Sequence, residues 1–130
     1  MHMLRGLSVA VLVVVAIFVA ACGKDDIHIT QEDAVRIMKS NPDAIVLDVR
    51  TKEEFDKRHL PNTLLVPIDN LRAGDFSALP DKDATILIYC RTGRRAEDSA
   101  AILLDHGYKR VYEFGGLVDW TGAVEGTEVK

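Results

Sequence analysis

The chain of 130 residues is predicted to fold as an α/β domain, in which a parallel sheet has helices on both faces. Two uninterrupted apolar runs, residues 44–49 and 84–89, have the length and composition of strands that are covered on both sides. Segments with helical spacing of apolar residues alternate with the strand-like runs, as parallel β-α-β units require. A chain of this length holds one such domain.

The domain is predicted to begin with a short strand and a helix. Residues 27–29 form a β-type run, and Thr30 is placed to cap a helix because Asp33 follows three residues later. Asn41-Pro42 ends this helix, since the residue before a proline disfavours helical backbone. The first strong strand, 44–49, comes next.

Shorter elements connect the two strong strands. Thr51 and Glu54 repeat the capping pattern, which predicts a short helix. A brief strand at residues 64–66 ends at Pro67, and residues 70–76 are predicted to be helical.

The second strong strand runs directly into Cys90 and an arginine-rich turn. Apolar residues at helical spacing predict a helix over residues 96–104, and Gly107 is placed to cap its end. Residues 111–114 form the last strand, and Gly115-Gly116 then turns the chain. Strands and helices therefore alternate to the end of the domain.

The first residues of the chain are predicted to be an address signal outside the fold. Arg5 precedes an uncharged apolar stretch that ends in Val19-Ala20-Ala21-Cys22, as in a secretory signal. These four residues resemble the lipobox of bacterial lipoproteins, in which the cysteine carries lipid as the first mature residue. The expected boundaries are a signal peptide at 1–21, lipidated Cys22 with a linker at 22–26, the domain at 27–124 and a tail at 125–130.

This interpretation places the domain outside the cytoplasm, tethered to the cell envelope. Gly23 favours the outer membrane, facing the periplasm, because an aspartate there would resemble an inner-membrane retention signal. An uncleaved membrane anchor, with residues 6–23 at the lower limit for a span, and plain cleavage stay open as alternatives. Lipidation of Cys22 leaves Cys90 as a lone thiol, so a reduced partner such as a thioredoxin-like protein is expected to regenerate it.

Charge and histidine spacing argue against two classes of function. The net charge of -4 disfavours general nucleic-acid binding, which needs a basic surface. None of the four histidines stands at metal-ligand spacing with another histidine, a cysteine or a pair of carboxylates. We therefore expect neither a nucleic-acid partner nor a metal site.

The turn from Cys90 to Arg95 has the properties of an anion site. A helix N-terminus offers free N–H groups and partial positive charge, and Gly93 lets a compact turn aim further N–H groups at one point. These donors and the three arginines favour a thiolate on Cys90, which can attack an electrophilic sulfur or phosphorus in an anion. A buried structural cysteine is the alternative, but basic residues at a helix N-terminus are unfavourable without an anion.

Motifs in a fixed order extend over about residues 27–121. The loop reads Cys90-Arg91-Thr92-Gly93-Arg94-Arg95. The other motifs are Val46-Leu47-Asp48-Val49-Arg50 with Glu54-Phe55, His59-Leu60-Pro61 with Val66-Pro67, and Gly107-Tyr108, Val111-Tyr112, Gly115-Gly116 and Trp120. Together they resemble the rhodanese family, whose active-site loop is Cys-x-x-Gly-x-Arg.

The resemblance implies a rhodanese-like sheet of about five strands and a sulfurtransferase without a cofactor. The Cys90 thiolate would take sulfur from a donor such as thiosulfate, and the Cys90 persulfide would pass it to cyanide or a thiol. The loop backbone would cradle the persulfide, Arg91 and Arg94 would guide the anion, and Arg95 would pair with Asp48 or Glu54. The expected substrate-binding residues are Arg91, Thr92, Gly93, Arg94 and Arg95, and the expected supporting residues are Asp48, Arg50 and Glu54.

Some positions depart from the family's usual residues. Arg58 stands where glycine is usual, Asn62-Thr63 where Gly-Ala is usual, Leu65 where asparagine is usual and Ala96 where serine is common. They lie outside Cys90 and its six-residue turn, so they bear on the rim of the site and on the acceptor more than on the persulfide step.

Two rival functions stay open. Phosphatases of the same fold use Cys-x-x-x-x-x-Arg to enclose a tetrahedral phosphate, whereas here Arg95 comes one residue too early and Ala96 holds the arginine position. A phosphatase or arsenate reductase therefore fits less well than a sulfurtransferase.

The second rival is a non-catalytic module that carries sulfur or binds a partner. His59 and Trp120 are interpreted as structural, although His59 could act in proton transfer near pH 7.

Overall fold

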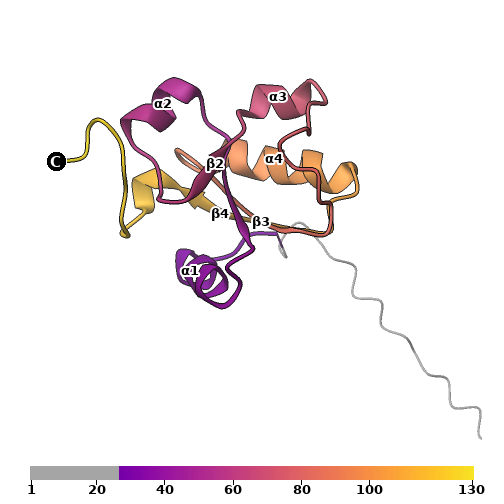
Figure 1. The fold of residues 1–130 in the computed structure, drawn as a ribbon, viewed down its shortest axis with the longest axis horizontal. Helices are drawn as coiled ribbons and strands as arrows, with labels where there is room; N and C mark the ends of the chain where they lie inside the picture. Colours follow the sequence, from indigo (N-terminus) through magenta and orange to yellow (C-terminus); the bar gives the residue numbers. More distant parts are fainter. Residues whose placement is uncertain (1–26) are drawn as a thin grey trace, which may run out of the picture.

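The computed structural model describes residues 27–130, in which a parallel sheet lies between two layers of helices (Figure 1). The strands are β1 (Ile45–Asp48), β2 (Thr63–Leu65), β3 (Thr85–Cys90) and β4 (Arg110–Gly116), and the helices are α1 (Gln31–Ser40), α2 (Lys52–Lys57), α3 (Ile68–Arg72) and α4 (Arg94–Asp105). The strand order is β2-β1-β3-β4, and every neighbouring pair is parallel. The predicted fold class is confirmed.

The sheet has four strands within the described residues, and a single bridge continues it beyond β4. His28 pairs with Glu113 in parallel fashion, and Ile29 N–H donates to the Glu113 carbonyl at 2.9 Å. Glu113 N–H donates to the Ile27 carbonyl at 2.8 Å. The β-type run expected at residues 27–29 therefore joins the sheet as an isolated bridge centred on His28, and not as a strand.

Local signals set most element boundaries. Thr30 caps α1 by accepting from Asp33 N–H, and Thr51 with Glu54 forms a complete capping box on α2. The helix predicted at residues 70–76 instead spans Ile68–Arg72, because Pro67, with its fixed φ, stands at its start.

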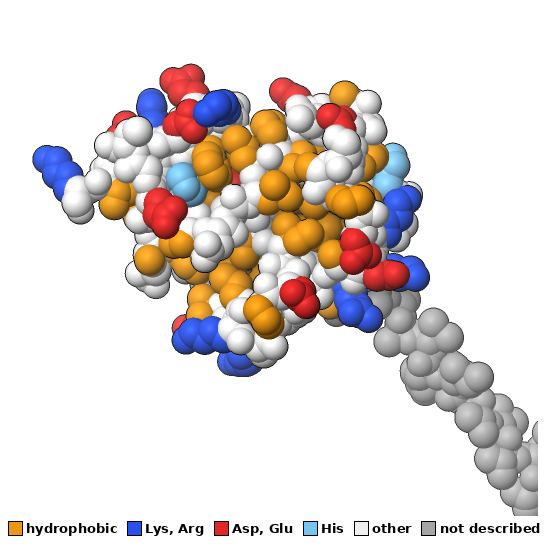
Figure 2. All heavy atoms as spheres, in the orientation of Figure 1, with side chains coloured by type: hydrophobic (Ala, Val, Ile, Leu, Met, Phe, Trp, Pro, Cys, Tyr) orange, Lys and Arg blue, Asp and Glu red, His pale blue; other side chains and the backbone are white. Residues whose placement is uncertain are grey.

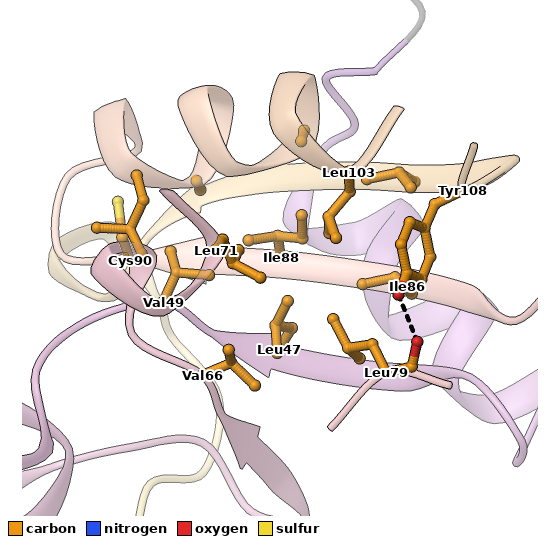
Figure 3. Close-up of a cluster of buried hydrophobic side chains, with 14 residues drawn as sticks. Leu47, Val49, Val66, Leu71, Leu79, Ile86, Ile88, Cys90, Leu103 and Tyr108 are labelled. Atoms are coloured by element: carbon orange, nitrogen blue, oxygen red, sulfur yellow. Dashed lines mark hydrogen bonds between the residues drawn. The ribbon is translucent and has the colours of Figure 1, made fainter. Parts of the chain in front are cut away.

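The two strong strands bury both of their faces. Ile86 and Ile88 face a core built with α3 and α4, and Leu87 and Tyr89 face a second core built with α1. Figure 3 shows the first core, with Cys90 at one end of the row of side chains along β3. This continuous burial explains the uninterrupted apolar runs in the sequence. It also places Cys90 at the carboxyl edge of the sheet, where sites in α/β folds lie.

The residues predicted as a tail are bonded to the body of the domain. Glu125 pairs with His59 in an antiparallel bridge, and the N–H groups of Thr127 and Glu128 donate to carbonyls of α2 at 3.0 and 3.1 Å. A Cβ on Gly126 would lie 2.3 Å from the Lys57 carbonyl oxygen, so only glycine permits this approach. We name residues 125–129 the C-terminal strap.

The expected signal peptide and the lipidated Cys22 lie outside the described residues. Within residues 27–130, no helix is long and apolar enough to cross a membrane.

Candidate active site

Cys90 is the last residue of β3 and lies against β4 at Gly116. Its side chain is a free thiol with 1% exposure. The segment without regular structure that follows it is Arg91–Gly93, since α4 begins at Arg94. The turn is therefore three residues long rather than the six that the sequence suggested, because Cys90 stays in the strand and the last two arginines enter the helix.

The loop aims a backbone donor at the sulfur. Gly93 N–H donates to Cys90 Sγ over 2.9 Å. Gly93 has φ +116°, a conformation that residues with a Cβ avoid, so glycine is required at this turn. The sulfur also lies near the start of α4, whose first N–H groups have no partner inside the helix. The site therefore offers hydrogen bonds to a negatively charged sulfur.

One side of the loop is held by an ion pair between α4 and α2. Arg95 donates to both Glu54 carboxylate oxygens, at 2.7 and 2.9 Å. The hydrogen bonds from Arg95 lower the pKa of Glu54 from 4.5 to about 2, and they raise the pKa of Arg95. Of the two carboxylates that the sequence offered to Arg95, the structure pairs it with Glu54 and not with Asp48.

Asp48 and Arg50 form a buried pair behind this ion pair. Arg50 donates to the Asp48 carboxylate through Nε and a terminal nitrogen, the shortest contact being 2.7 Å. The same guanidinium donates to the Arg58 carbonyl at 2.6 Å, which ties the end of β1 to the end of α2. Burial alone would lower the pKa of Arg50, but the hydrogen bonds and charge of Asp48 outweigh it and raise the pKa. The pair orders the chain around α2.

The other side of the loop rests on glycine. A Cβ on Gly116 would lie 2.2 Å from the Arg91 carbonyl oxygen, and one on Gly93 would lie 3.4 Å from Gly115 Cα. Val118 N–H donates to the Arg91 carbonyl at 3.1 Å. The loop and the end of β4 are thus in direct backbone contact.

A buried carboxylate holds this glycine turn. Glu113 accepts from Gly115 N–H at 2.9 Å, and its other oxygen is 2.5 Å from His28 Nδ1. Glu113 is 6% exposed. Sequence reasoning identified Gly115-Gly116 but missed Glu113, whose only signal was a charge inside an otherwise apolar strand.

A family model described as rhodanese-like domain matches residues 30–123. The chain belongs to the rhodanese-like domain family. The tRNA uridine(34) hydroxylase of Pectobacterium atrosepticum is 36% identical over 93 residues, which are 68% of this chain and 26% of that protein. The chain thus spans about a quarter of the curated relatives it matches.

Solved structures with the same fold include a rhodanese with anions from E. coli. It is 28% identical, has a TM-score of 0.58, and the match covers 65% of this chain and 99% of that one. Protein hp1203 from Helicobacter pylori is 31% identical with a TM-score of 0.62, over 79% and 92% of the two chains.

The rhodanese-like loop keeps its remaining polar side chains at the surface. Arg91, Thr92 and Arg94 are exposed, and Arg94 Nε lies 3.9 Å from Asp98. The structure therefore gathers Gly93, Arg95 and Glu54 around Cys90, but leaves these three side chains on the outside.

His59 and Trp120 are held by local contacts in this rhodanese-like domain. The His59 ring stacks on Phe55 at 3.8 Å, and its Nδ1 lies 2.7 Å from the Phe55 carbonyl oxygen. Trp120 packs against Phe114 and donates to the Ala123 carbonyl at 3.1 Å. Both side chains have the surroundings of structural residues. Among residues 27–130, no three side chains are grouped as a metal site requires.

Proposed function

We propose that the protein is a sulfurtransferase that carries sulfane sulfur as a persulfide on Cys90. The supporting observation is the Gly93 N–H aimed at Cys90 Sγ from a three-residue loop at the start of a helix. Such a loop directs backbone donors at the sulfur, and these donors would stabilise the negative charge of a persulfide. The cofactor-free chemistry needs only the thiolate and these donors.

The reaction has two nucleophilic steps. The Cys90 thiolate attacks the outer sulfur of thiosulfate, the new S–S bond forms, and the S–S bond of thiosulfate breaks with its electron pair leaving on sulfite. An acceptor such as cyanide or a thiol then attacks the outer sulfur of the persulfide. The Cys90–sulfur bond breaks, and its electron pair restores the Cys90 thiolate.

Steady-state release of sulfite tests this proposal. Full-length protein, purified in detergent and freshly reduced, is mixed with thiosulfate and cyanide, beside the Cys90→Ser variant. We expect sulfite and thiocyanate in equal amounts from the wild-type protein and neither from the variant. Absence of turnover with both cyanide and thiol acceptors would favour a non-catalytic sulfur carrier or partner-binding module.

Two other functions find less support. The phosphatase pattern has its arginine six residues after the cysteine, where this chain has Ala96, which argues against a phosphatase or arsenate reductase. The match to the tRNA uridine(34) hydroxylase covers only 26% of that protein. Figure 2 shows acidic and basic side chains interspersed on the face in view, around hydrophobic side chains at its centre, which is not a basic surface for RNA.

We further propose that the domain is tethered to the envelope through lipid on Cys22, with a thioredoxin-like partner keeping Cys90 reduced. The support for the anchor is the sequence of residues 1–22, and the support for the partner is that lipidation of Cys22 would leave Cys90 without a second cysteine in this chain. We expect the wild-type protein to show the added mass of a lipid and to be labelled metabolically with a fatty acid, and we expect the Cys22→Ser variant to show neither. Labelling that persists in this variant would exclude Cys22 as the lipid site.

A further inference from the structure

A cleft of about 220 Å³ lies beside the Cys90 loop. Arg91 and Leu117 both line it. Arg91 directly follows Cys90, and Leu117 directly follows Gly116, the residue of β4 that pairs with Cys90. Val118 completes this wall, and Lys57 and Arg58 at the end of α2 form another. The cleft therefore opens beside the loop that begins at Cys90, the residue that would hold the transferable sulfur.

The free charge of the cleft is positive. Arg50 and Glu54 also line it, but they are paired with Asp48 and Arg95. Arg58 and Arg91 have no carboxylate within ion-pair distance among residues 27–130.

Lys57 makes only a loose pair, 3.8 Å from Glu53. Glu128 is the one lining carboxylate in the described chain that has no such partner. Three cationic side chains thus face one carboxylate.

The remaining wall is apolar and open to solvent. Val118 is 61% exposed, and Leu117 lies beside it in the cleft. An inorganic anion such as thiosulfate has no apolar part to place against these side chains, and it is small compared with the cleft. A carbon chain that ends in a carboxylate would contact both the apolar wall and the arginines.

We propose that this cleft binds the sulfur acceptor and selects an organic thiol that carries a carboxylate. The inference rests on the proposed persulfide on Cys90. The acceptor thiolate attacks the outer sulfur, an S–S bond forms on the acceptor, and the Cys90–sulfur bond breaks with its electron pair returning to Sγ. The products are the acceptor persulfide and the Cys90 thiolate, so no further oxidant or reductant is required.

The C-terminal strap sets the strength of this selection through Glu128. Backbone hydrogen bonds and Gly126 hold the strap on α2. The glutamate side chains of the strap can therefore be substituted without removing these contacts. Glu128 lines the cleft, whereas Glu125 on the same strap faces His59, 3.6 Å away. Glu128 therefore opposes an anionic acceptor, and Glu125 provides a control of equal charge.

The test isolates the second half-reaction. Full-length protein is loaded with thiosulfate, separated from excess donor, and mixed with either 3-mercaptopropionate or its methyl ester, which lacks the carboxylate charge and carries one more methyl group. The rate constant of sulfur loss from Cys90 for each thiol is divided by its rate with a small-molecule persulfide. The acid-to-ester ratio is the corrected rate constant for the free acid divided by that for the methyl ester. We expect this ratio to exceed one in the wild-type protein.

Matched variants locate the effect. Arg58→Gln should reduce the acid-to-ester ratio by about threefold, and Glu128→Gln should raise it by about threefold, as expected for single partly solvated charges. Arg36→Gln, on the far helix α1, and Glu125→Gln should leave the ratio unchanged. High salt should move the wild-type ratio toward one.

The outcomes separate the two proposals. Failure to load sulfur on Cys90 overturns the sulfurtransferase and the acceptor cleft together. Normal loading with equal corrected rates for acid and ester, or equal responses of Arg58→Gln and Arg36→Gln, overturns the acceptor cleft and leaves the sulfurtransferase standing.

Discussion

The Cys90 loop is supported on two sides that differ in kind. Toward α2 it is held by the Glu54–Arg95 ion pair, whose side chains are 29% and 31% exposed. Toward β4 it rests on Gly116, where the space beside the Arg91 carbonyl admits no Cβ. The first support consists of charges that water partly screens, and the second is close packing of backbone on backbone.

This difference determines how each side responds to change. An ion pair can weaken gradually, because water replaces lost hydrogen bonds. A filled space cannot, because an added atom must displace the loop. We therefore expect the glycine side to control the geometry of the Sγ site, and the ion pair to adjust its stability.

The largest expected effect comes from Gly116→Ala. The new Cβ would meet the Arg91 carbonyl oxygen at 2.2 Å, so the loop must move away from β4. We expect a loss of about 3 kcal/mol in the free energy of unfolding and about a hundredfold in sulfite turnover. Chemical denaturation and the sulfite assay, run below the unfolding midpoint, measure both.

Gly115→Ala is the adjacent control. Gly115 has φ +86° but no atom within 4 Å of an added Cβ, so this variant introduces backbone strain without a clash. It should lose about 1 kcal/mol of stability and keep most of its turnover. If both variants lose activity equally at equal folded fraction, the glycine contact does not position the loop.

A smaller effect is expected from Glu54→Gln. The amide cannot form a charged pair with Arg95, and we expect a loss of about 1 kcal/mol of stability near pH 7 with a severalfold loss of turnover. Glu53→Gln is the matched control, since Glu53 is on the same helical turn and 84% exposed. Equal losses in the two variants would show that the ion pair contributes nothing specific.

The same pair predicts a pH dependence. The pKa of Glu54 in the folded protein is about 2, below its ordinary value of 4.5. The carboxylate is therefore favoured by folding, and its contribution is complete above pH 4.5 and lost as the pH falls toward 2. The stability difference between wild type and Glu54→Gln should shrink over this range, which urea titrations at several pH values can follow.

The fold was largely predictable from local patterns. Thr51 and Glu54 marked α2, and two apolar runs marked the central strands, because capping and burial leave direct traces in the sequence. The position of α3 was predicted less well, because Pro67 placed its start earlier than the apolar pattern indicated.

The candidate site was predictable where it depends on neighbouring residues. The sequence of the loop identified Cys90 and Gly93, but the choice of Glu54 over Asp48 as the partner of Arg95 depends on where α2 packs. The support from Glu113 and the strap that brings Glu128 to the cleft depend on contacts between distant segments. No local pattern records such contacts.

The most direct test is the mass of the protein after one exposure to thiosulfate without any acceptor. Reduced full-length protein and the Cys90→Ser variant are each incubated with thiosulfate and then separated from it. Their masses are measured on the intact protein and on its peptides. We predict that the wild-type protein gains one sulfur atom on the Cys90 peptide, that one sulfite appears per protein, and that cyanide removes the added mass. An unchanged mass, or an equal gain in Cys90→Ser, would contradict the persulfide account.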